Sequence, residues 1–146
     1  VVARKLYDEK LNRMLEEFRR SRGINVIYRG DEGTGLALLR AIKRDDIIGF
    51  LVDQNIKGVP VVESIFLGIP SMTPSGFAKV AIRFSMPVVV GVNVRERPFR
   101  FSILLSDPIF PDGKREREIV DIVNSILSRF ILSHPEQWMW FHRRWG

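Results

Sequence analysis

The segment from Pro70 to Phe84, PSMTPSGFAKVAIRF, carries the clearest helix start in the sequence. Thr73 is a residue type that caps helices, and Pro74 then falls at the first helical position, where proline is favoured. Apolar residues follow at helical spacing and would face a core. They are Phe77, Val80, Ala81 and Phe84. We therefore predict that a helix begins here, shortly after an apolar run that is typical of a buried strand.

Strands and helices alternate on both sides of this segment. The expected strands cover residues 1–4, 24–28, 47–52, 61–67, 87–94 and 99–105. The expected helices cover residues 7–22, 36–44, 74–84 and a long stretch after Asp112. Because strands that alternate with helices usually form parallel sheets, we predict a single α/β domain over residues 1–146. Its layered sheet would have mostly parallel strands and an antiparallel part, flanked by helices.

Composition narrows the class of protein. The 146 residues include no cysteine, which excludes disulfides, zinc-thiolate sites and thiol catalysis. Lys and Arg total 23 against 17 Asp and Glu, and the net charge of +6 favours an anionic partner such as nucleic acid, acidic lipid headgroups or an acidic carrier protein. Phosphate-loop, nucleophile-elbow and paired-histidine metal motifs are absent from the sequence, so we expect neither a cofactor nor a metal.

Two loops are candidate sites. Asp53 follows the expected strand at 47–52, and ligands of open α/β sheets bind beyond the carboxyl ends of strands. Its carboxylate could orient a catalytic partner or accept a hydrogen bond from a sugar hydroxyl, although capping of the next turn explains the same residue. The segment Thr73–Gly76 could bind a phosphate or an oxyanion through free backbone N–H groups, although ordinary helix capping needs no ligand.

The tail at residues 134–145, HPEQWMWFHRRW, contains all three tryptophans beside basic residues. On a helix Trp138, Phe141 and Trp145 would share a face and seal the core, whereas Trp beside Arg also suits a membrane–water boundary. His142, next to Arg143, fits a phosphate-facing or interfacial tail better than proton transfer.

This tail resembles the closing signature of the bacterial lipid A biosynthesis acyltransferases, a late acyltransferase family that includes lauroyl and myristoyl transferases. Three further stretches are similar to that family and extend the resemblance over nearly the whole chain. They are VARK at 2–5 with LNRML at 11–15, LVDQ at 51–54 with GVPVV at 58–62, and FLGIPSMTPSGFAK at 66–79.

The resemblance implies a fold like that of the glycerol-phosphate acyltransferases. It also implies transfer of a fatty acyl chain from acyl carrier protein, or from acyl-CoA in some members, to a hydroxyl of a lipid A precursor at the cytoplasmic face of the bacterial inner membrane. Arg19 and Asp53 match functional positions of the family, so we expect them to be catalytic, with Arg19 stabilising an oxyanion or binding a phosphate. The residues expected to bind substrate are Lys57, Gly58, Thr73, Gly76, His142 and Arg143.

One feature of the family is not found. The family uses a His with an acid five residues on, and no His precedes His134 in this chain. We therefore expect residues 1–146 to be the C-terminal portion of a larger acyltransferase domain, with the catalytic His and a membrane anchor upstream, and to be inactive alone. The alternatives are an acyltransferase of the phosphatidylinositol mannoside type and a non-catalytic module that binds anionic membranes. Nucleic-acid binding is not expected, because no such motif is recognisable.

Overall fold

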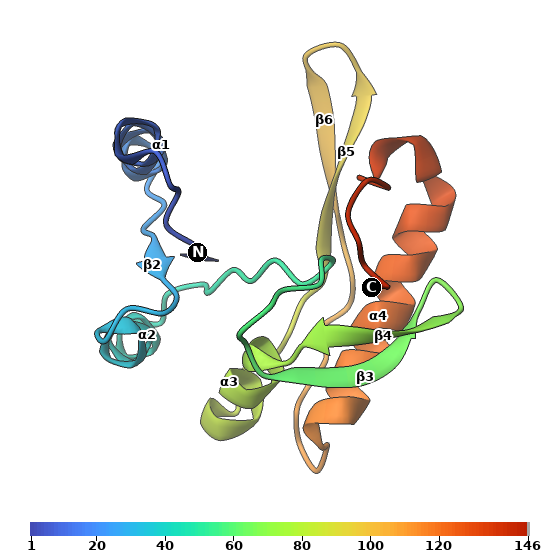
Figure 1. Cartoon of the computed structure of the whole chain (residues 1–146). Coiled ribbons are helices and arrows are strands. Elements are labelled where there is room, and N and C mark those ends of the chain that lie inside the picture. Colours follow the sequence, from blue (N-terminus) through green and yellow to red (C-terminus); the bar gives the residue numbers. More distant parts are fainter. Residues whose placement is uncertain (146) are drawn as a thin grey trace. The chain divides into compact units, whose positions relative to one another are not determined.

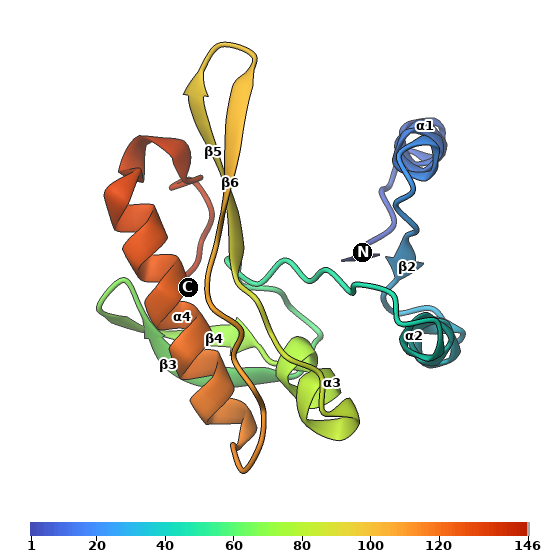
Figure 2. The same ribbon diagram turned by 180° about the vertical axis from the view of Figure 1, so that it is seen from behind.

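The computed structural model of the chain describes residues 1–145. The chain separates into two compact units, Val1–Leu51 and Val52–Gly146 (Figures 1 and 2), which we call unit 1 and unit 2. The single domain expected from the sequence stays a prediction.

Unit 1 is built from two short strands and two helices. In chain order they are β1 (Val2–Ala3), α1 (Glu9–Ser21), β2 (Ile27–Tyr28) and α2 (Thr34–Lys43). Strands β1 and β2 pair in parallel over two residues each. The Asp8 side chain caps α1 by accepting a hydrogen bond from the N–H of Leu11. Asn12 is buried and donates to the Tyr28 hydroxyl at 2.7 Å, which ties α1 to β2.

The strand predicted at residues 47–52 is wrong. This segment is irregular, and Ile47 and Leu51 expose 98% and 71% of their surface. It makes one backbone hydrogen bond to β1, from the N–H of Val2 to the carbonyl of Gly49. An apolar run becomes a strand only when neighbouring strands complete its ladder and bury its side chains, and here neither condition is met. Asp53 therefore does not follow a strand end.

Unit 2 contains two hairpins, two helices and the tail. Its elements are β3 (Val61–Phe66), β4 (Ile69–Pro74), α3 (Gly76–Phe84), β5 (Gly91–Arg97), β6 (Arg100–Leu105), α4 (Glu116–Ser133) and a 3₁₀ turn at Pro135–Gln137. Helix α4 runs along the β3–β4 hairpin (Figures 1 and 2). Its buried apolar residues complete the core together with Phe66, Phe77, Ala78 and Ala81. On α4 they are Ile119, Val120, Val123, Leu127 and Ile131.

The chain is a mixed α/β protein as predicted, but the mostly parallel layered sheet is wrong. Within residues 1–145 the strands form three separate pairs, and only the short pair of β1 and β2 is parallel. Two-residue turns explain this, because so short a loop can join only antiparallel strands. Leu67 and Gly68, with φ of 52° and 80°, join β3 to β4 in the conformation that tight hairpins require. Pro98 and Phe99 join β5 to β6, confirming an antiparallel pair in this region.

The predicted start of helix α3 is also wrong. Thr73 and Pro74 end strand β4, opposite Val62 and Val61 of β3. The helix begins at Gly76, with Ser75 at the cap position. Pairing with β3 holds Thr73 and Pro74 extended, so Thr73 does not cap the helix.

Candidate functional site

The tail of unit 2 positions Asp53. The carboxylate lies half-buried in the loop that opens this unit, and its Oδ2 accepts a hydrogen bond from Nε1 of Trp138 at 3.3 Å. These two residues are 85 positions apart in the chain. No strand directly precedes Asp53, and its carboxylate is oriented instead by the indole N–H of Trp138 in the tail.

Trp138 belongs to an aromatic cluster built around the fully buried Phe66 ring. The ring of Phe66 lies 5.7 Å from that of Trp138 and 6.2 Å from that of Trp145, and the two tryptophans are 6.1 Å apart. Such tilted contacts between rings add stability beyond the area that they bury. The tail is not a helix beyond its 3₁₀ turn, and Phe141 is 98% exposed. The prediction that Phe141 shares a core-sealing face is therefore wrong, because that face exists only on a continuous helix.

Arg144 is the most deeply buried charge in the described chain. Its Nη1 donates to the carbonyl of Met72 at 2.6 Å, and its Nη2 donates to Oγ1 of Thr73 at 2.7 Å. The guanidinium also lies 4.5 Å from the centroid of the Phe66 ring, within cation–π range. Burial lowers the pKa of Arg144, and the negative charge of Asp53 opposes that change. Asp53 is therefore close enough for the two charges to interact.

Thr73 joins three elements of unit 2. Its Oγ1 accepts hydrogen bonds from Arg144 of the tail and from Nδ2 of Asn124 on α4, the latter at 2.8 Å. Thr73, Asn124 and Arg144 are each fully buried. Strand β4, helix α4 and the tail thus meet at one hydroxyl. We call Asp53, Trp138, Arg144, Thr73 and Asn124 the tail-lock network.

The other residues predicted for the site lie outside this network. Lys57 and Gly58 are exposed in the loop after Asp53, and Gly76 is the half-buried first residue of α3. His142 is half-buried and Arg143 is exposed. The Nδ1 of His142 has no hydrogen-bond partner among the residues that the structure describes. Their role in binding substrate stays a prediction.

Arg19 lies in the last turn of α1, in unit 1, and is half-buried. Burial lowers the pKa of the Val1 amino group, and the positive charge of Arg19 lowers it further. The Arg19 side chain is therefore not simply part of a solvated helix face. Its catalytic role stays a prediction.

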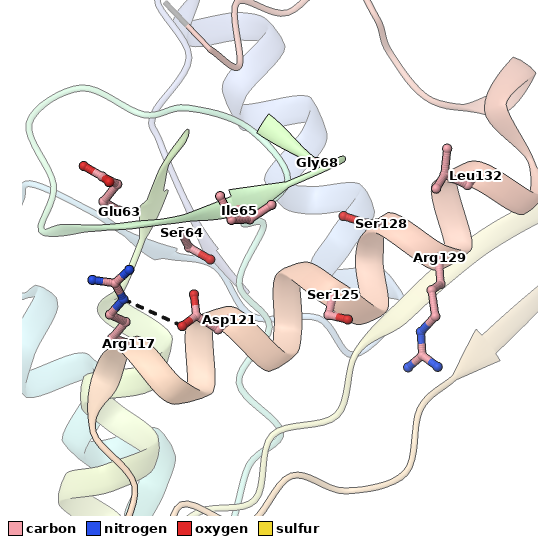
Figure 3. Close-up of a pocket in the computed structure, with 10 residues that line it drawn as sticks. All are labelled: Glu63, Ser64, Ile65, Gly68, Arg117, Asp121, Ser125, Ser128, Arg129 and Leu132. Carbon is pink, nitrogen blue, oxygen red and sulfur yellow. Dashed lines mark ion pairs between the residues drawn. The ribbon is translucent and has the colours of Figure 1, made fainter. Parts of the chain in front are cut away.

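A shallow groove of about 480 Å³ lies between β3 and α4 (Figure 3). None of the predicted site residues lines it. Arg117 and Asp121 at its edge pair with each other at 3.8 Å. Because these charges are already matched, we assign the groove no ligand.

Sequence reasoning missed Arg144 and Asn124. Asn124 interrupts the apolar face of α4 between Val120 and Leu127, and a polar residue at a core position is a signal of a buried hydrogen bond. Arg143 and Arg144 cannot be told apart by sequence pattern, because the tail has no regular period that assigns one of them to the interior.

Across residues 1–145, no three His, Asp or Glu side chains gather in a way that could hold a metal ion. No helix within the same range has the length and apolarity needed to cross a membrane.

Comparison with known families places the chain among acyltransferases. The sequence model of the bacterial lipid A biosynthesis acyltransferases matches residues 1–146, the whole chain. The chain belongs to this family. A comparison with curated proteins gave no match.

Replacing Trp138 by phenylalanine tests how the tail holds Asp53. The substitution keeps a ring against Phe66 but removes the indole donor to the Asp53 carboxylate. We expect the free energy of unfolding to fall by about 1 kcal/mol, the usual value of one partly exposed hydrogen bond. Urea unfolding followed by far-ultraviolet circular dichroism measures it. The matched control is Trp140→Phe, which removes a donor to the Pro135 carbonyl within the tail itself. Hydrogen exchange at residues 52–56 reports the contact between the tail and the Asp53 loop. If Trp140→Phe raised this exchange as much as Trp138→Phe, the result would contradict the role of Trp138 in holding Asp53.

Proposed function

We propose that this chain acts in the transfer of a fatty acyl chain from acyl carrier protein to a hydroxyl of a lipid A precursor, at the cytoplasmic face of the bacterial inner membrane. The observation that carries the proposal is the family match over the whole chain. The net charge of +6 supports it, because both an acidic carrier protein and a phosphorylated glycolipid are anionic.

In this reaction the acceptor hydroxyl attacks the thioester carbonyl carbon, the carbon–sulfur bond breaks, and the hydroxyl proton ends on the departing thiol. Negative charge develops on the carbonyl oxygen during the attack. Arg19 supplies a permanent positive charge that would stabilise this oxygen or bind an acceptor phosphate. Asp53, held by Trp138 in a fixed orientation, would position the group that receives the proton or an acceptor hydroxyl.

The remaining predicted residues would bind the two substrates. The exposed Lys57 and Arg143 present cations to an anionic partner, while Gly58 and Gly76 allow close approach of a ligand to the backbone. A Cβ at Gly58 or Gly76 would meet no atom within 4 Å, so both positions are open. His142 lies beside Arg143 in the chain and is the last of the residues proposed to bind substrate. Thr73 is fully buried and its Oγ1 accepts hydrogen bonds from Asn124 and Arg144, so it would act indirectly, by holding the tail in place.

Donor choice can be tested by binding. Isothermal titration of the 146-residue chain with acyl carrier protein bearing a fatty acyl chain should give clear binding that weakens as salt is added, because the attraction is electrostatic. Charge reversal in Lys57→Glu and Arg143→Glu should weaken it about tenfold, mainly through slower association. Arg129→Glu on α4 is the matched control. Equal binding of acyl-CoA and of the acylated carrier, without salt dependence, would contradict the assigned donor.

A further inference from the structure

The hairpin of β5 and β6 has one face that unit 2 leaves uncovered. In the antiparallel register Phe101 lies opposite Arg95, Ile103 opposite Asn93 and Leu105 opposite Gly91, and residues directly opposite each other share a face. All six are exposed. We call them the outer face. Figures 1 and 2 show the hairpin extending beyond the other elements of unit 2.

The outer face is apolar along β6. Phe101, Ile103 and Leu105 expose 58%, 72% and 66% of their surface. The inner face already packs on the unit, since Val94 is only 8% exposed. Gly91 allows the Leu105 side chain to lie across β5, because a Cβ at this glycine would stand 3.1 Å from Cδ2 of Leu105. A row of large apolar side chains that unit 2 does not bury is typical of an interaction surface.

The turn at the tip of the hairpin places a second exposed aromatic ring, that of Phe99, in solvent. Phe99 has φ of 63°, a left-handed conformation that glycine or asparagine adopts readily and a bulky residue does not. Its ring is 99% exposed and does not pack within unit 2. Leu67 adopts a similar φ in the β3–β4 turn, so the argument for Phe99 is its ring, which unit 2 leaves exposed at the tip of the hairpin.

The hairpin is basic around this aromatic tip. Residues 91–105 contain three arginines and one acid, Glu96. Glu96 pairs with Arg100 at 3.0 Å and accepts a hydrogen bond from Ser102. Arg95 on the outer face and Arg97 near the tip keep their charge for a partner, and both are exposed. Aromatic rings beside arginines suit the boundary between water and anionic lipid, where rings reach the headgroup level and cations meet phosphates.

The outer edge of β5 is hydrogen-bonded to the tail at Arg95. The side chain of Gln137 accepts a hydrogen bond from the N–H of Arg95 at 2.7 Å and donates one to its carbonyl at 3.1 Å. These two bonds cap the backbone where a strand from a second protein would pair. They also fix the hairpin to the tail. The edge of β5 at Arg95 is therefore not open to an added strand.

We propose that the β5–β6 hairpin docks onto an anionic lipid surface, with Phe99, Phe101 and Ile103 entering the headgroup boundary while Arg95 and Arg97 bind lipid phosphates. This inference deepens the proposed function, on which it rests for the kind of membrane involved. It names the segment of the chain that brings the site to a lipid acceptor.

Vesicle sedimentation of the 146-residue chain tests the docking surface. Vesicles of phosphatidylethanolamine with phosphatidylglycerol should bind the chain, and vesicles of phosphatidylcholine alone should bind it far less. Phe99→Gly relieves the strained turn, so it should keep or raise the midpoint of urea unfolding while weakening vesicle binding about tenfold. Arg95→Gln should weaken binding to the anionic vesicles only. Phe110→Ala and Arg129→Gln remove an exposed ring and an exposed cation elsewhere in unit 2 and should change binding by less than about twofold.

The outcomes separate this proposal from the proposed function. Loss of vesicle binding in the hairpin variants but not in the controls supports docking, whether or not acyl transfer is ever detected. Unchanged vesicle binding in Phe99→Gly and Arg95→Gln overturns it. So does a loss confined to self-association in sedimentation velocity, or to binding of acyl carrier protein, because the outer face would then serve another partner.

Discussion

Arg144→Ala should destabilise unit 2 by about 3 kcal/mol, since charge-assisted hydrogen bonds contribute roughly 1.5–3 kcal/mol each and a truncated buried side chain leaves a cavity. The guanidinium donates to the Met72 carbonyl and to Oγ1 of Thr73, and it covers the Phe66 ring. Its removal leaves the Met72 carbonyl short of a partner and detaches the tail from β4. We expect the tail to loosen along with the loss of stability.

Urea unfolding followed by tryptophan fluorescence measures this loss in unit 2 alone, because all three tryptophans lie in that unit. Arg143→Ala is the matched control, since its side chain is exposed and its loss should change the free energy of unfolding by less than about 0.5 kcal/mol. Arg144→Lys should recover only part of the stability, because an ammonium group cannot reproduce the planar two-point geometry. Equal stability of the Arg144→Ala and Arg143→Ala variants would show that the tail does not lock unit 2.

Asp53→Asn should lower the rate of acyl transfer by about 100-fold, which is the usual scale when a positioning charge is removed from a reacting centre. The amide keeps an oxygen that can accept the Trp138 hydrogen bond, so the fold should survive the change. The negative charge beside Arg144 is what the substitution removes. The effect is therefore expected in the rate constant for transfer and not in the urea midpoint.

The assay uses the enzyme purified from the complete gene, with acylated carrier protein as donor and the lipid product followed by mass spectrometry. Asp107→Asn is the matched control, because Asp107 is exposed in the segment after β6 and belongs to no part of the proposed site. Full activity of Asp53→Asn would remove Asp53 from the catalytic set. A collapse in stability instead of rate would reduce its role to that of a structural anchor.

Local signals in the sequence predict most single elements of this fold. Helix α4 follows from the spacing of Ile119, Val123 and Leu127, and the β5–β6 pair follows from two strand-like runs joined by a short turn. The pairing of strands does not follow, because it depends on partners distant in the chain. The segment at 47–52 has strand-like composition yet stays irregular, and the two-residue turns impose antiparallel pairs where alternation suggested parallel ones.

In the candidate site, too, the sequence predicts individual residues but not the distant partners that position them. Asp53 was predicted both from its place after an expected strand, which is wrong, and from the resemblance to the family. The structure adds what orients its carboxylate, which is Trp138 of the tail. Thr73 was chosen as a helix cap and is instead the hydroxyl that links β4, α4 and the tail. No sequence rule could have distinguished the buried Arg144 from the exposed Arg143, because only the path of the irregular tail decides which side chain turns inward.

The most direct measurement is the acyl transfer reaction itself. The enzyme from the complete gene is incubated with fatty acyl carrier protein and a lipid A precursor in anionic vesicles, and the glycolipid is analysed by mass spectrometry. We predict a product heavier by one acyl chain, attached through an ester, with formation of free carrier thiol in equal amount. A folded enzyme that leaves the lipid A precursor unchanged, or that acylates a phosphatidylinositol mannoside in its place, would contradict the proposed function.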